Sequence, residues 1–314
     1  SRGDFNTAVG YESLFTDTVH GRATAFGYRA LYSNAPTEIS YNVAVGYAAG
    51  VVNSTGIQNT FIGGNAGVNN TVGGQNTAVG FEALQTNIGG VGSTAVGRRA
   101  LYSQSLAAGS TADLKNTGVG FNAGFYISTG TFNTAIGVNS LGTGISTANT
   151  GSANTCIGKD AGFLLRGAAA NNTFVGESSG ESMTSGSGNT IIGRFDGQEN
   201  SLDIRASDNN IVLSAGDGAY QIHINSEGEK VMRGGGVTAD GVGAGSQSGF
   251  YFGNAGDQYS SRATSSNSIH VRFFNTNGGV GNISTNGSAT AYNTSSDYRL
   301  KENVDYTWDA TTRL

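Results

Sequence analysis

The sequence predicts an all-β fold: a β-roll or β-helix solenoid built from short repeats, followed by a short β shaft or tip segment. Three observations lead to this prediction. A five-residue motif of the NTAVG type recurs along the first two thirds of the chain, 51 of the 314 residues are glycine, and proline occurs once. Glycine enrichment without proline argues against collagen and proline-rich linkers, which leaves a β architecture rich in turns.

The motif occurs eleven times, and its closing glycine is never replaced. The distance from one closing glycine to the next runs from 17 to 23 residues. Short repeats at a nearly fixed period are typical of solenoids, in which each repeat forms one coil of a stack. The copies are Asn6–Gly10, Ala23–Gly27, Asn42–Gly46, Asn59–Gly63, Asn76–Gly80, Ser93–Gly97, Asn116–Gly120, Asn133–Gly137, Asn154–Gly158, Asn172–Gly176 and Asn189–Gly193.

Each position of the motif has its own residue preference. The residue before the glycine is always apolar, and the residue two places earlier is threonine in ten of the eleven copies. Alternation along a strand puts these two on one face, and we expect that face to point into the coil. The small residue between them then faces outward, against a neighbour. The glycine is expected at a tight corner, in a conformation or clearance that other residues lack.

A second pattern follows each corner. Three and four residues after the glycine, the chain has Ala or Ser followed by Leu or Gly, as at Ala30–Leu31 and Ala66–Gly67. A coil of about 17 residues buries little by itself, so stability must come from stacking and from neighbouring chains. Exposed edges would also invite aggregation. We therefore interpret residues 1–215 as a β-roll or β-helix stack within a parallel homotrimeric fibre.

The rest of the chain divides into three further segments. Residues 216–248 are expected to be connecting strands and a glycine-rich hinge, and residues 249–295 a distal β shaft or tip. Residues 296–314 form a separate segment in which charged residues are concentrated, although only 12% of the whole chain is charged.

Composition excludes several classes of function. The net charge is −5 with no basic block, which argues against nucleic-acid binding. No apolar run approaches the length of about 20 residues that a membrane span needs, so we expect no membrane insertion. Cys156 is the single cysteine and the three histidines are scattered. We accordingly predict no disulfide framework, no metal site and no cofactor.

Two resemblances give these patterns a context. The NTAVG repeats resemble the head repeats of trimeric autotransporter adhesins and the repeats of many bacteriophage tail fibres, over about two thirds of the chain. Near the C-terminus, the stretch SSDYRLKENV at residues 295–304 resembles the start of an intramolecular chaperone domain of the S74 peptidase type. This second resemblance is specific but covers less than a tenth of the chain.

The chaperone resemblance implies a self-cleaving pair, with Ser296 as the nucleophile and Lys301 as the general base. A neutral lysine would be needed, so burial or a nearby positive charge such as Arg299 would have to lower its pKa. On spacing alone, the favoured interpretation is a solvated helix that begins at Ser296 with Asp297 in its first turn, and only the resemblance favours a cleavage site. Only the opening of the chaperone domain is present, so we expect this chain itself not to be an enzyme.

Together the resemblances imply a trimeric phage tail fibre that binds a host-surface glycan or protein through avidity. They imply a place in the virion tail, outside cells, with other tail proteins as partners. Chaperone-assisted trimerisation and self-cleavage would belong to the full-length parent. Two alternatives are a bacterial trimeric surface adhesin and a tailspike that cleaves polysaccharide, although no pair of carboxylates facing across a groove can be identified in the sequence.

Several segments are candidates for receptor binding. The aromatic residues of the distal segment are the first choice, because this segment would lie nearest the host. The insertions at 104–115 and 142–153 are also candidates, because insertions in solenoids project as surface loops. Aromatic residues after five corners could stack on sugars, but packing between coils or between chains is favoured. The distal candidates are Phe250, Tyr251, Phe252, Phe273 and Phe274.

Overall fold

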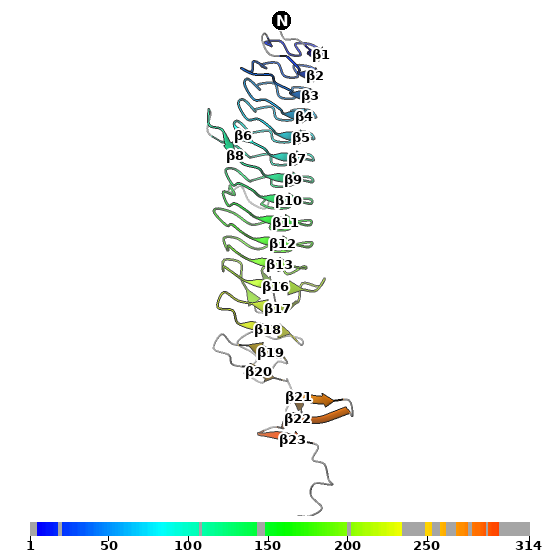
Figure 1. Ribbon diagram of the computed structural model, residues 1–314, viewed down its shortest axis with the longest axis vertical. Coiled ribbons are helices and arrows are strands. Elements are labelled where there is room, and N and C mark those ends of the chain that lie inside the picture. The colour runs from blue at the N-terminus through cyan, green and yellow to red at the C-terminus, as the bar shows by residue number, and fades with distance from the viewer. Residues whose placement is uncertain are drawn as a thin grey trace, which may run out of the picture. The chain divides into compact units, whose positions relative to one another are not determined.

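The computed structural model describes residues 5–17, 21–106, 109–142, 148–199, 202–233, 249–252, 258–261, 268–275, 278–286 and 288–294. These residues form strands and turns, and they contain no helix. Each of the eleven motif copies forms one strand of a β-solenoid (Figure 1). The predicted all-β repeat solenoid is therefore confirmed. The chain divides into two compact units between Met232 and Arg233.

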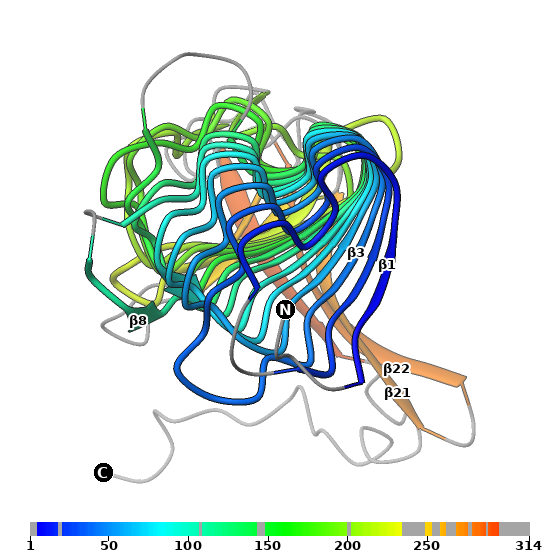
Figure 2. The same ribbon diagram turned by 90° about the horizontal axis from the view of Figure 1, so that it is seen from above.

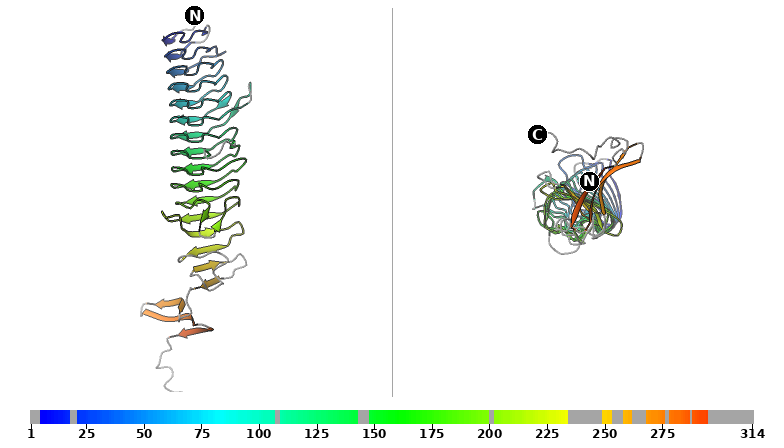
Figure 3. Two further views of the ribbon diagram at one scale, coloured as in Figure 1. Left: turned by 180° about the vertical axis from the view of Figure 1, so that it is seen from behind. Right: turned by 90° about the horizontal axis from the view of Figure 1, so that it is seen from below.

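The strands of the motif form one continuous parallel sheet along the first unit. Their pairing is in register throughout, so that Ala78 of one coil pairs with Ala95 of the next. Seen from above, successive coils lie over one another with a gradual rotation (Figure 2), and from behind their strands align in one column (Figure 3). The strands are β1 (Thr7–Val9), β2 (Thr24–Phe26), β3 (Val43–Val45), β4 (Thr60–Ile62), β5 (Thr77–Val79), β7 (Thr94–Val96), β9 (Thr117–Val119), β10 (Thr134–Ile136), β11 (Thr155–Ile157), β12 (Thr173–Val175) and β13 (Thr190–Ile192).

The direction in which these strands face is the reverse of the sequence prediction. From the second coil on, the middle residue of each motif strand points into the core and is buried, as Ala25 and Ala44 show. The flanking residues point outward, and Phe26 and Ile62 are 57% and 38% exposed. The prediction was wrong because apolar character was taken to indicate the inside. The interior beside the strand is narrow and selects small residues instead.

The core explains why Leu alternates with Gly four residues after the corner. Two coils have Phe61 or Phe174 where most of the others have a small residue. A side chain at Gly50 would have its Cβ 2.7 Å from Phe61, and one at Gly180 would have its Cβ 2.8 Å from Phe174. In the coil that contains Ala78, the corresponding place is filled by buried Leu84. Large and small residues thus compensate for one another within and between coils.

The corner glycines meet both requirements that the sequence suggested. Their φ angles lie between 105° and 139°, a region that L-residues rarely adopt. A Cβ atom at Gly46 would also collide with the backbone carbonyl of Gly63 in the next coil, and the other corners from Gly10 to Gly176 repeat this contact. Conformation and clearance together explain why the motif keeps this residue in every copy.

From the third coil on, buried side-chain amides connect each coil to the next. The backbone N–H of Asn76 donates to Oδ1 of Asn59 at 3.0 Å, and Nδ2 of Asn59 donates to the carbonyl of Gly73 at 2.8 Å. The same two bonds recur along the stack, so the amides pair backbone groups that would otherwise be buried without partners. The residues of this asparagine ladder are Asn42, Asn59, Asn76, Asn116, Asn133, Asn154, Asn172, Asn189 and Asn210.

The ladder has one irregular step. Ser93 stands where the coils on either side have asparagine. Its Oγ still accepts the backbone N–H of Asn116 in the next coil at 3.3 Å, but serine has no amide to donate to a backbone carbonyl as the asparagines do. Gln104 compensates: its Nε2 donates to Oγ of Ser93 at 2.9 Å, and its Oε1 accepts from Nδ2 of Asn116 at 2.9 Å. All three side chains are fully buried. A longer amide from another position therefore continues the ladder.

The parallel stack ends in an antiparallel cap. Strand β16 (Ile211–Ser214) joins β13 in parallel, and β17 (Tyr220–Ile224) and β18 (Lys230–Arg233) follow in antiparallel pairing. In this cap, Nε2 of buried His223 lies 3.0 Å from Oδ1 of Asn210, the last asparagine of the ladder. The cap pairs the strand edge at which the parallel stack would otherwise stop.

The two insertions rejoin the stack. Residues 104–115 begin and end in the core at Gln104 and Leu114, and β8 (Ala112–Asp113) pairs in parallel with β6 (Gly90–Val91). In the second insertion, Asn149 bridges to Ile127 and to Gly167 in the neighbouring coils. A short antiparallel pair, β14 (Gln198–Glu199) with β15 (Leu202–Asp203), precedes the cap.

The second unit is antiparallel. It contains the pair β19 (Gly249–Phe252) and β20 (Gln258–Ser261). It also contains a three-stranded sheet of β21 (Ser268–Asn275), β22 (Gly278–Asn286) and β23 (Ala289–Thr294).

Compensation in the core predicts a coupled pair of substitutions. Phe61→Ala should lower the free energy of unfolding by about 3–5 kcal/mol, because it leaves a cavity. Gly67→Leu alone should also destabilise, because its side chain would collide with Phe61. The double variant recreates the pairing of Ala78 with Leu84 and should recover much of the loss. A double-mutant cycle by chemical denaturation measures this coupling, and additive losses would contradict it.

The histidine of the cap predicts a dependence of stability on pH. Burial lowers the pKa of His223 from 6.5 to about 4. Between these values the unfolded chain binds a proton that the folded chain does not, so stability falls as the pH is lowered from 6.5 towards 4. The full effect is on the order of 3 kcal/mol.

His223→Gln keeps an amide that can donate to Asn210 and removes the titration. Denaturation at pH 7 and pH 5 should show that this variant loses less stability on acidification than the unsubstituted chain. An equal loss in the His223→Gln variant and the unsubstituted chain would contradict the assignment.

Candidate functional site

The predicted catalytic pair lies outside the described residues. Ser296, Lys301 and Arg299 all follow Thr294, the last described residue, so self-cleavage stays a prediction. Of the aromatic receptor candidates, Phe250, Tyr251 and Phe252 lie in β19, and Phe273 and Phe274 lie in β21. Strand β19 pairs with β20, whereas β21 belongs to the three-stranded sheet of the second unit.

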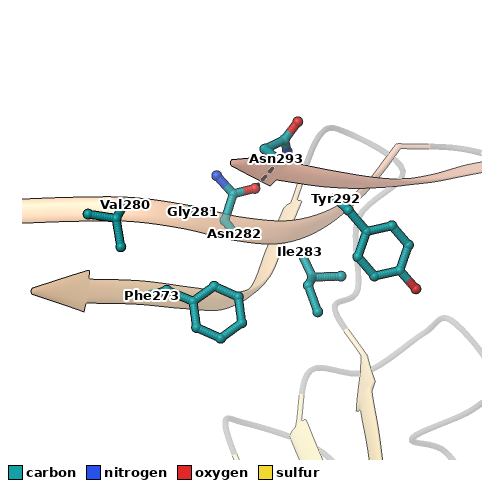
Figure 4. A pocket seen from close by; sticks show the side chains of 7 residues that line it. All are labelled: Phe273, Val280, Gly281, Asn282, Ile283, Tyr292 and Asn293. Atoms are coloured by element: carbon teal, nitrogen blue, oxygen red, sulfur yellow. Dashed lines mark hydrogen bonds between the residues drawn. The ribbon is translucent and has the colours of Figure 1, made fainter. Parts of the chain in front are cut away.

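Phe273 borders a shallow apolar hollow on the three-stranded sheet. The hollow has a volume of about 350 Å³ and lies over Gly281, which has no side chain to fill it. Phe273, Ile283 and Tyr292 point to this side of the sheet, whereas Asn282 and Asn293 point to the other side (Figure 4). Phe273 is 51% exposed and Tyr292 is 78% exposed. Two exposed rings beside an apolar hollow can contact a ligand or another chain.

The opposite side of the same sheet is polar. Nδ2 of Asn293 donates to Oδ1 of Asn282 at 2.7 Å and to Oγ of Ser284 at 2.9 Å. The two faces of the sheet therefore differ in chemistry, and the apolar face is the one that gains most from contact with another surface.

Tyrosines after the first corners form a stacked ladder on the outside of the solenoid. The ring centroids of Tyr11 and Tyr28 are 5.6 Å apart, those of Tyr28 and Tyr47 are 5.1 Å apart, and the rings are nearly parallel. Both faces of the Tyr28 ring are thus covered by its neighbours. A sugar stacks on an aromatic face, so the central ring of this ladder offers only its edge, and the geometry favours packing over sugar stacking.

A groove runs along the side of the stack. It has a volume of about 450 Å³ and crosses four consecutive coils between β3 and β9. Hydroxyl groups of Thr71 and Thr86 donate to backbone carbonyls and keep their lone pairs as acceptors. The side chain of Asn69 is exposed. The groove is lined by Val52, Asn69, Thr71, Thr86, Ile88 and Ser105.

The lining of this groove is uncharged. It combines hydroxyl and amide groups with two aliphatic side chains, which suits a neutral, hydroxyl-rich ligand. The six lining residues include no carboxylate, so they supply no acid pair for glycoside hydrolysis. The sequence alone does not indicate this groove, although Ser105 belongs to the insertion at 104–115 that is predicted to project.

Ion pairs account for several charged residues of the stack. Glu12 binds Arg29 of the next coil at 2.6 Å, and Glu82 binds Arg99 in the same way. The hydrogen bond that Arg99 donates to the Glu82 carboxylate raises the pKa of Arg99. These contacts repeat the coil spacing of the ladder and occur in exposed or half-exposed positions, where a pair adds little stability.

The outward residues of the motif strands form a continuous surface, called here the strand face. It consists of a threonine column, an apolar column and a corner column that contains the residue after each corner glycine. The apolar column is half-exposed along its length, with Val9 at 47%, Val96 at 37% and Ile192 at 48%. Its residues are Val9, Phe26, Val45, Ile62, Val79, Val96, Val119, Ile136, Ile157, Val175 and Ile192.

Metal-binding and membrane-spanning features were also sought in the described part of the chain. No group of three or more His, Cys, Asp or Glu residues there could hold a metal ion. The same residues include no helix long and apolar enough to cross a membrane. Cys156 is fully buried, and burial raises the pKa of its thiol.

Comparison with known proteins gives no relatives: no family model matches the chain, and no curated protein or solved structure is significantly similar to it. The interpretation of function therefore rests on the fold, on the surfaces described above and on the resemblances in the repeat and C-terminal motifs.

Proposed function

We propose that this chain is the subunit of a trimeric fibre of the bacteriophage tail-fibre class, which attaches to a glycan on a host surface. The observation that carries the proposal is the uniform solenoid of eleven strands in one parallel register. Such a stack is a rod whose length is set by the number of repeats, as a spacer or attachment fibre requires. The NTAVG and SSDYRLKENV resemblances support the same class.

The solenoid is suited to resist bending and slippage. Every step between neighbouring motif strands is in register, and buried amides link successive coils inside the stack. A one-residue slip would bring outward residues into the narrow core and separate the asparagines from their partners. Because only one strand register is possible, each surface of the solenoid keeps a fixed position along the axis of the stack.

The proposed attachment surface on the rod is the groove that crosses four consecutive coils between β3 and β9. Its uncharged lining of hydroxyl, amide and aliphatic groups matches the chemistry of neutral sugars better than that of charged ligands. In a trimer three copies of this groove would act together, so that weak single contacts sum to strong attachment. The exposed rings at Phe273 and Tyr292 are a second place where the fibre could contact its receptor.

Blocking the groove tests this proposal. Asn69→Arg places a long side chain over the lining and should weaken binding to host cells or to an array of neutral glycans by on the order of tenfold or more. Asn171→Arg is the matched control, because Asn171 is also exposed and lies outside the groove. The control should bind as the unsubstituted chain does.

Other outcomes of this experiment would contradict the proposal. Unchanged binding by the Asn69→Arg variant would remove the groove from the attachment surface. Absence of binding by the unsubstituted chain to any host-surface glycan would contradict glycan attachment itself. Release of oligosaccharides during incubation would identify a depolymerase instead of a binding fibre.

A further inference from the structure

The strand face is unusual for the surface of a single chain. Its apolar column continues through all eleven coils without a charged residue, and the exposed fractions range up to 57% at Phe26. Soluble monomers rarely expose contiguous apolar patches larger than a few hundred Å². Because the strands are paired in register, the residues of the column lie directly over one another from coil to coil. The result is a regular apolar ridge along the rod.

The neighbouring corner column adds to the ridge in the first part of the stack. Tyr47 is 61% exposed and Phe81 is 45% exposed, and both flank the apolar column directly across a corner glycine. From the first coil to the eighth, this column contains mostly aromatic or aliphatic residues. They are Tyr11, Tyr28, Tyr47, Phe81, Phe121 and Val138.

The corner column then changes character. In the last three coils it contains Lys159, Glu177 and Arg194, and Nζ of Lys159 lies 3.7 Å from Oε1 of Glu177. Arg98 is the one charged residue among the earlier corners, and its guanidinium lies over the ring of Phe121, 5.2 Å from the centroid. The strand face is therefore apolar at its N-terminal end and charged along one edge at its C-terminal end.

We propose that the strand face is the contact between copies of this chain, which lie parallel and in axial register. The inference rests on the proposed trimer and names the surface that forms it. Parallel copies in register bring the aromatic corners of one chain against those of its neighbour. At the C-terminal end of the stack, the corner column carries a positive, a negative and a positive residue in successive coils. Parallel copies in register bring these coils close together, so a charge of one copy can pair with the opposite charge one coil away in its neighbour.

The opposite orientation is disfavoured by the same residues. Antiparallel copies would place Lys159, Glu177 and Arg194 against the tyrosine corners of the first coils. These charged groups would then lose water against aromatic rings and would gain no oppositely charged group from the neighbouring copy, which costs free energy. Register is specified as well, because a shift of several coils would begin to overlap the apolar and charged ends.

This contact differs from the one expected from the sequence. For the motif strands, the sequence predicts contact between chains through the small middle residues, such as Ala78 and Ala95. These side chains are fully buried within their own coil and cannot reach a neighbouring chain. The residues on either side of them are the ones available for contact.

Cross-linking of single engineered cysteines tests the face, the orientation and the register together. Val45→Cys, Val96→Cys and Val175→Cys place a thiol near the start, middle and end of the apolar column. Native Cys156 is fully buried and stays out of the reaction. With a short bis-maleimide, each variant should link to its own copy on a denaturing gel, and Asn69→Cys on the side of the stack should not.

Light scattering on the same samples separates failure of this inference from failure of the proposed trimer. The unsubstituted chain should show three times 32.0 kDa. A single-chain mass would overturn both proposals. A trimer in which Asn69→Cys links and the column variants do not would overturn only the face. A trimer in which Val45→Cys links to Val175→Cys only in mixed samples would overturn the parallel orientation. Dissociation of the column variants with an intact Asn69→Cys trimer would support the face.

Discussion

The buried side-chain amide that joins one coil to the next is the interaction on which the rest of the structure depends. Oδ1 of Asn116 accepts the backbone N–H of Asn133 at 2.8 Å, and Nδ2 of Asn116 donates to the carbonyl of Gly130 at 2.8 Å. A coil of this size has little apolar core, and its turns leave backbone groups that no strand pairs. The asparagine pairs them, and because it does so across coils, it also sets the height and register of the next coil.

The other features of the solenoid follow from this register. Corner glycines lie directly over one another, which leaves no space for a Cβ atom between Gly80 and Gly97. Outward residues form straight columns, so a residue type that recurs at one position of the repeat forms a continuous stripe on the surface. In this way tyrosines stack, Glu82 pairs with Arg99, and the apolar column extends along the whole stack. Regularity inside thus creates the regular outer surface that we propose for contact between copies.

The sequence predicted the repeat, the all-β solenoid and the glycine corner, because each depends only on period and on backbone conformation. Its prediction of which side of the strand faces inward was wrong. Threonine, valine and alanine are all compatible with either side, and the decision depends on the width of the coil, which is a property of the stacked structure. One signal points to the correct side: asparagine is the first residue of nine of the eleven copies, and it shares a face with the buried middle residue.

The surfaces were harder to predict than the fold. The groove is formed by residues from four coils that are distant in sequence, and no single segment indicates it. The apolar face beside Phe273 depends on Gly281 and Tyr292 from other strands of its sheet. The self-cleaving pair and the trimer were derived from motifs that resemble known families, and both stay proposals.

Stability of Asn59→Asp, compared with Asn69→Asp, tests the central claim most directly. The two substitutions are chemically identical, but Asn59 is fully buried in the ladder and Asn69 is exposed. Aspartate at position 59 loses the donor to Gly73 and places a carboxylate in the core. The account predicts a fall in the free energy of unfolding of at least about 2–3 kcal/mol for Asn59→Asp and a change within about 0.5 kcal/mol for Asn69→Asp. Equally small changes in both variants would contradict the claim that the amide ladder holds the solenoid together.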